Sequence, residues 1–174
     1  MSIRHFIQQT KEIQKVLDKF PGHAAIIAVN FSKERFRMKN WVDQRREPWK
    51  NISPVTRRYY LSNKRKRIPG SLMLRTGRLK RSIRKLYVSR NMIIIGTDVP
   101  YAKILNDGGH ITKTVKVKKH TRKLTRGRKK TAEVKAHIRK MNTKIPSRRF
   151  IGPSALLMRR LERHLDKELK KILQ

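Results

Sequence analysis

Residues 145–154, IPSRRFIGPS, join the most basic part of the chain to its most regular helical pattern. Pro146 has no backbone N–H to donate, so it is expected to end the basic segment before it. Phe150 and Ile151 are predicted to anchor the chain in the core, and Gly152-Pro153 to start the last helix. The stretch therefore predicts a hinge between a charged arm and an apolar body, although an ordinary strand-to-helix connection would explain Phe150 equally well.

The segment after this hinge, from Pro153 to Gln174, has the clearest helical pattern in the chain. Its leucines recur every four residues, and Ile172 closes the stripe. We assign residues 150–174 to a C-terminal helix whose stripe is expected to pack into the subunit core. The stripe consists of Leu157, Leu161, Leu165 and Leu169.

The segment before the hinge, residues 111–149, is predicted to be a long basic hairpin arm. It holds 16 Lys and Arg against one acid, Glu133, and the pattern V-K-x-H-x-R-K occurs at 117–123 and again at 134–140. Alternating residues in both copies predict two strands with a tip near Gly127. One thin apolar face is expected from Val115, Val117, Val134, Ala136 and Ile138.

The cations of this arm are the predicted contacts for nucleic acid or for an acidic partner. Because a lone two-stranded hairpin is marginal in water, the arm is expected to need a neighbour to stay folded. The candidate contacts are Lys116, Lys118, Lys119, Arg122, Lys123, Arg126, Arg128, Lys129, Lys130, Lys135, Arg139 and Lys140.

The overall charge supports a polyanionic partner. Among 174 residues, 47 Lys and Arg stand against 11 Asp and Glu, which gives a net charge of +36. Nucleic acid is the first candidate, although acidic protein surfaces and anionic membranes would feel the same field. Hydrophobic residues make up 37% of the chain and fall in periodic segments, so we expect one packed domain over residues 1–174.

The chain has no cysteine, which excludes disulfides and thiolate metal sites. Its apolar runs, such as Met92–Ile95, are far shorter than the roughly 20 residues that span a bilayer. The first residues lack the apolar core of a signal peptide. We therefore expect a soluble, unsecreted protein with no membrane partner.

The N-terminal part, residues 1–47, is predicted to be helical. Apolar spacing indicates helices over 2–20 and 23–38, separated by Pro21-Gly22. Trp41 and Trp49 lie in a polar segment and are expected to cover the edge of the core, in preference to stacking on bases.

The central part, residues 48–110, is predicted to be mixed. We expect an exposed basic loop at 62–70 and a short helix over 78–85 with Thr76 as its N-cap. A hairpin is predicted around residues 89–91, and a short helix over 99–106 that ends at 107–109. Together these elements predict an α+β fold: a small domain of helices and antiparallel sheet with a long basic β-hairpin arm and a C-terminal helix.

Catalytic motifs are lacking. The acids are dispersed, and no nucleotide-binding fingerprint is present, so neither an enzyme nor a cofactor is expected. His110, His120 and His137 near Asp107 could be imagined as a metal site, but two of these histidines fall in cationic strands that would oppose a divalent ion. No sequence-specific DNA-binding motif appears. A basic RNA-binding protein of the ribosomal type remains the alternative, although the arm has no aromatic residue on which bases could stack.

Three patches, in order and spacing, resemble the virion-morphogenesis or tail-completion proteins of tailed bacteriophages such as Mu and lambda. They are residues 74–83, LRTGRLKRSI; residues 95–104, IGTDVPYAKI, with the glycine pair 108–109; and residues 145–152, IPSRRFIG. The positions that carry the resemblance are Thr76, Gly77, Leu79, Ile83, Gly96, Tyr101, Ala102, Gly108, Gly109, Pro146, Arg148, Phe150 and Gly152.

The resemblance implies a structural protein of the phage neck that completes the tail and joins it to the head. It implies assembly in the bacterial cytoplasm and incorporation into the virion. The implied partners are further copies in a ring and other neck, connector or tail-terminator proteins. The cationic arm would face either genomic DNA in the conduit or an acidic ring partner.

Overall fold

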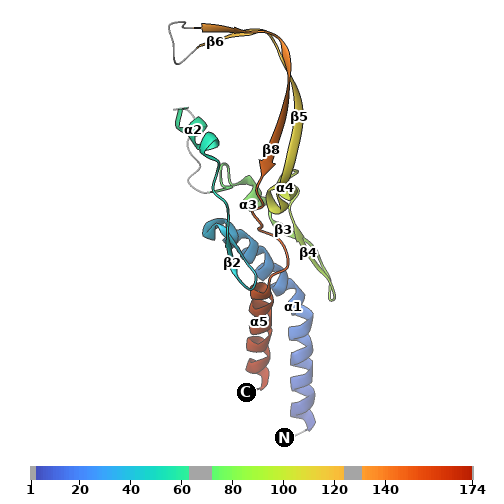
Figure 1. The fold of residues 1–174 in the computed structure, drawn as a ribbon. Helices are drawn as coiled ribbons and strands as arrows, with labels where there is room; N and C mark the ends of the chain where they lie inside the picture. The colour runs from blue at the N-terminus through green and yellow to red at the C-terminus, as the bar shows by residue number, and fades with distance from the viewer. Residues whose placement is uncertain (1–2, 63–71, 124–130, 174) are drawn as a thin grey trace.

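The computed structural model describes residues 3–62, 72–123 and 131–173, and it has an α+β fold built on one long helix (Figure 1). Every strand pair in the described chain is antiparallel. The elements, in order, are α1 (Ile3–Met38), β1 (Asn40–Val42), β2 (Arg46–Pro48), α2 (Pro54–Ser62), α3 (Arg78–Ser82), β3 (Arg84–Val88), β4 (Ile93–Gly96), α4 (Ala102–Asp107), β5 (Gly109–Val117), β6 (His120–Lys123), β7 (Thr131–Val134), β8 (His137–Ile145) and α5 (Ala155–Leu173).

Helix α1 runs through Pro21, so the prediction of two separate helices is wrong. Proline has no N–H for the carbonyl of Leu17, and this loss normally breaks or kinks a helix. Here Pro21 is buried, and Ala24, Ala25 and Ala28 after it are also buried. Tertiary packing of this small-residue face therefore keeps the chain helical, and α1 changes direction along its length (Figure 1).

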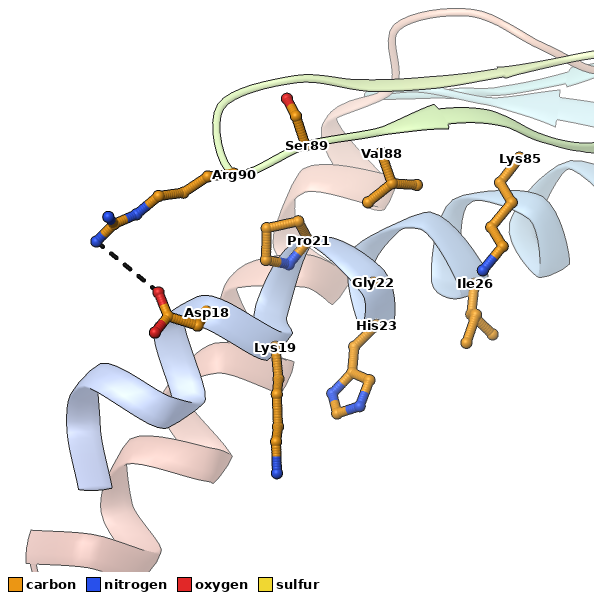
Figure 2. A pocket seen from close by; sticks show the side chains of 10 residues that line it. All are labelled: Asp18, Lys19, Pro21, Gly22, His23, Ile26, Lys85, Val88, Ser89 and Arg90. Atoms are coloured by element: carbon orange, nitrogen blue, oxygen red, sulfur yellow. Dashed lines mark ion pairs between the residues drawn. The ribbon is translucent and has the colours of Figure 1, made fainter. Parts of the chain in front are cut away.

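The hairpin of β3 and β4 lies beside this part of α1, as predicted for residues around 89–91. Figure 2 shows its tip next to Pro21, where Arg90 reaches toward Asp18 across 3.9 Å. A surface pocket of about 520 Å³ lies between the two elements. The tip thus lies beside α1 at the residue where the helix loses a hydrogen bond.

Helix α5 packs antiparallel to α1, with both chain ends on the same side of the molecule (Figure 1). Contacts join Glu34 to Arg160, His23 to His164, and Gln9 to the carbonyl of Ile172. The leucine stripe faces α1 only in part, since no described residue of α5 is fully buried. On the N-terminal half of α1, Ile3 and Phe6 are mostly exposed.

The start of α5 differs from the prediction. Ser154 is its N-cap: the Ser154 hydroxyl oxygen accepts the N–H of Leu157 over 3.2 Å, and Asp43 accepts the N–H of Ala155 over 2.6 Å. The helix therefore begins two residues after Pro153, with a carboxylate from another part of the chain at its positive end.

Three elements of the first 62 residues were missed. β1 and β2 form a hairpin around the tryptophans, and α2 begins at Pro54 with Ser53 capping the N–H of Thr56 over 3.2 Å. The predicted basic loop at 62–70 lies almost wholly outside the described residues. Within the described helices, none is long and apolar enough to cross a membrane.

Candidate functional site

The arm projects from the body as a two-stranded ribbon, at the end of the molecule opposite the two termini (Figure 1). β5 pairs with β8 over nine residues, and β6 pairs with β7 over four. The predicted hairpin is therefore confirmed. Its predicted tip at Gly127 and four of its candidate cations, Arg126, Arg128, Lys129 and Lys130, lie outside the described residues.

The other eight candidate cations are all exposed. Cross-strand partners lie on the same face of a ribbon, so the register assigns each residue to a face. Val115 pairs with Arg139, whereas Thr114 pairs with Lys140 on the opposite face. Positive charge is therefore present on both faces of the arm. The eight residues are Lys116, Lys118, Lys119, Arg122, Lys123, Lys135, Arg139 and Lys140.

The predicted apolar face of the arm is wrong in part. Ile138 pairs with Lys116, so it lies on the face opposite to Val115 and Val117, and it is 65% exposed. Ala136 belongs to neither strand. Among the described residues of the ribbon, the half-buried apolar side chains are thus Val115, Val117, Ala132, Val134 and Ile145.

The repeated V-K-x-H pattern forms a matched break in both strands. Val117 pairs with His137, and His120 pairs with Val134, so the two copies lie across from each other. Each histidine donates its Nδ1–H over 2.9 Å to a lysine carbonyl two residues earlier, Lys118 or Lys135. The ribbon changes direction near these breaks (Figure 1), and Lys119 meets Glu133 at 2.5 Å.

The three sequence patches converge at the base of the arm. Pro146 directly follows the last residue of β8, which confirms that the basic segment ends there. Phe150 is 1% exposed and lies 5.1 Å, between ring centroids, from Phe36 of α1. The core cluster around it consists of Phe36, Trp49, Leu79, Ile83, Val99, Ala102 and Phe150.

The remaining patch residues surround this cluster. Thr76, Gly77, Leu79, Tyr101 and Arg148 line one pocket, Gly96 ends β4, and Gly152 lies beside Trp41. Gly108 has φ +77°, and a Cβ there would be 2.7 Å from the backbone nitrogen of Ser147. Only glycine therefore fits where α4, Gly109 of β5 and the segment after Pro146 meet.

The predicted N-cap of α3 is corrected. Gly77, with φ 71°, occupies the cap position, because this left-handed conformation disfavours a β-branched residue such as Thr76. The Thr76 hydroxyl accepts a long bond, 3.4 Å, from the N–H of Arg78. The helix also ends earlier than predicted, and residues 84–85 belong to β3.

Hydrogen bonds that the sequence did not reveal hold residues 146–151 in place. The Asn106 side-chain oxygen accepts the N–H groups of Phe150 and Ile151, and Trp49 Nε1 donates to the carbonyl of Arg149 over 2.8 Å. Trp41 and Trp49 are both buried, which confirms their predicted place at the core. The one sequence feature that could have indicated this role for Asn106 is its position in the last turn of a short predicted helix.

Arg148 is a buried cation held by uncharged groups. Its Nε donates to the carbonyl of Lys50 over 2.9 Å, and its Nη2 to that of Asn51 over 3.2 Å. Burial lowers the pKa of Arg148. A second buried arginine, Arg35, instead pairs with Glu34 at 3.2 Å.

Within the described chain, no group of three or more His, Asp or Glu side chains could hold a metal ion. His110 lies near Asn142 at the base of the arm, whereas His120 and His137 lie at its break. The imagined metal ligands are therefore not brought together.

Comparison with known proteins identifies a family. The model of the phage virion morphogenesis family matches residues 10–170, which include the arm and all three patches. No curated protein and no solved structure matches.

Proposed function

The chain belongs to the phage virion morphogenesis family, and from this premise we propose that it is a structural protein of the neck. In this proposal it completes the tail and joins it to the head, and it has no catalytic role. Further copies form a ring with it, and other neck, connector or tail-terminator proteins adjoin that ring.

The observation that carries the proposal is the geometry of the arm. It extends beyond the body, its described candidate cations are exposed, and they lie on both faces of the ribbon. A ribbon of this kind can contact a polyanion on one face and an acidic protein on the other. Binding to DNA would be driven by counterion release and would be blind to sequence.

The attachment of the arm to the body also supports the proposal. Residues 146–151 are tied to α4 through Asn106 and to the segment after β2 through Trp49 and Arg148. A load on the arm would therefore pass into the core cluster and α1. Such a mechanical link suits a protein that joins two parts of a particle.

Size-exclusion chromatography with light scattering at high salt tests the proposal, because high salt removes non-specific nucleic acid. A closed ring, or incorporation of the purified chain into tails, is the expected result. A monomer that protects structured RNA from nuclease would instead favour the ribosomal-type alternative.

A further inference from the structure

A pocket of about 420 Å³ lies away from the strands of the arm, between α3, α4 and the segment around Ile52. Its apolar walls include Met73, Leu79 and Leu105. Three arginines, Arg75, Arg78 and Arg148, also line it, and no described Asp or Glu does. The pocket therefore combines apolar walls with uncompensated positive charge.

Arg148 is the most unusual of these groups. It is only 8% exposed, and among the described residues it forms no ion pair. Its two hydrogen bonds go to neutral carbonyls, whereas a guanidinium has five N–H donors. A buried charge without a counter-charge is costly, and a carboxylate brought by a partner would relieve that cost.

The backbone around the pocket is held in an unusual conformation. Met73 has φ 61° although it is not glycine, and Gly77 has φ 71°. Positive φ at a residue with a long side chain is strained, and such strain is found preferentially at binding sites. In this protein, Met73 and the turn from Arg75 to Arg78 line the same pocket.

We propose that this pocket binds an acidic, partly apolar peptide segment of a partner protein. One carboxylate of the segment meets Arg148, a second meets Arg75 or Arg78 at the rim, and an adjacent apolar side chain packs against Leu79 and Leu105. Guanidinium groups bind carboxylates through paired hydrogen bonds, and a volume of this size suits a few side chains.

The combination of arginines and apolar walls in the pocket favours a peptide over a nucleic acid as the ligand. Both could neutralise the arginines, but a sugar-phosphate backbone would leave the Met73, Leu79 and Leu105 walls without an apolar partner. The inference concerns a surface separate from the arm, and it holds wherever the chain lies in the particle.

Methyl NMR on the full chain tests the inference. The probes are a short blocked peptide that alternates leucine and glutamate, its leucine-glutamine counterpart, and oligothymidylate. The leucine-glutamate peptide should shift the methyl signals of Met73, Leu79 and Leu105, and the glutamine version should not. Signals of Val115 and Val117 report separately on the arm.

Matched variants identify the charges involved. Arg75 and Arg78 are exposed, so Arg75→Gln with Arg78→Gln should leave the fold intact and weaken peptide binding at the pocket signals by about tenfold. Lys11→Gln with Lys15→Gln removes the same charge from the exposed surface of α1 and should leave that affinity within about twofold. The proposal would be overturned if both pairs of substitutions weakened peptide binding equally, or if the two peptides shifted the pocket signals equally. It would also be overturned if the peptide shifted only the arm signals, or if oligothymidylate shifted the pocket signals more than the peptide does.

Discussion

The side-chain oxygen of Asn106 accepts the backbone N–H of Phe150 over 2.9 Å and that of Ile151 over 3.0 Å. Asn106 belongs to the last turn of α4, just before the arm begins, and Phe150 enters the core just after the arm ends. One amide therefore joins the two ends of the arm to each other and to the core.

Replacement of this amide should destabilise the protein. Asn106→Leu leaves two N–H groups without their acceptor, and an unsatisfied buried donor costs about 1–3 kcal/mol. Urea unfolding should show a loss in this range or above. Asn142→Leu, on the exposed surface of β8, is the control and should change stability by no more than about 0.5 kcal/mol. Equal effects of the two changes would argue against the bridging role of Asn106.

Glu34 should make stability dependent on pH. A hydrogen bond from Arg160, 2.7 Å long, lowers the pKa of Glu34 below its ordinary value, with Arg35 adding to the effect. A lowered pKa in the folded state means that the ion pair stabilises the fold above the ordinary carboxyl pKa. This contribution is lost as the pH falls through the folded-state value.

Glu34→Gln should accordingly reduce stability at neutral pH by about 1 kcal/mol, the upper range for partly exposed pairs. The difference from the wild type should shrink below the ordinary carboxyl pKa. Thermal melts across this acid range measure it, with Glu162→Gln on the exposed face of α5 as the control. A gap between Glu34→Gln and the wild type that does not change with pH would refute the ionic account.

A leucine of the α5 stripe should contribute less to the stability of the fold than a fully buried core residue does. Leu161 is half-buried, whereas Ile83 is 0% exposed. Leu161→Ala should therefore cost about 1–2 kcal/mol, and Ile83→Ala about 2–5 kcal/mol. Light scattering on the Leu161 variant adds a second outcome: a smaller assembly containing folded subunits would place the stripe at an interface and not in the subunit core.

DNA binding by the arm should be non-specific and strongly salt-dependent. Replacing Lys116, Lys135 and Lys140 with Gln should reduce the salt slope by up to about 0.9 for each phosphate that the variant no longer neutralises, equally on unrelated sequences. The same change at Lys11, Lys15 and Lys19 of α1 removes equal charge and should leave the slope almost unchanged. Discrimination between DNA sequences that disappears on mutation of the arm would contradict this account.

Local signals predicted much of the fold because they coincide with tertiary packing. The hairpin around residues 89–91, the helix end at Asp107-Gly108, the arm and the burial of Phe150 all follow from turn chemistry or periodicity. Pro21 is one exception. A proline inside a helix typically costs about 3 kcal/mol, and the burial of Ala24, Ala25 and Ala28 in the folded protein, which helps to offset this cost, cannot be read from the local sequence.

The candidate site was less predictable. Alternation indicated strands in the arm, but the faces depend on the register, in which Val117 pairs with His137 and His120 with Val134. Odd-numbered residues pair with odd-numbered ones in this register, so Ile138 lies opposite to Val115 and Val117, and a shift of one residue would have reversed this. The pocket around Arg148 brings together residues from four separate parts of the chain, so its charge and depth emerge only in the folded protein.

Cryo-electron microscopy of purified virions tests the central proposal most directly. It should find copies of this chain in a ring between head and tail, with α1 and α5 in the ring wall and the arms against DNA or the adjoining ring. Absence of the chain from mature particles, or density for it at the distal end of the tail, would contradict the proposed function.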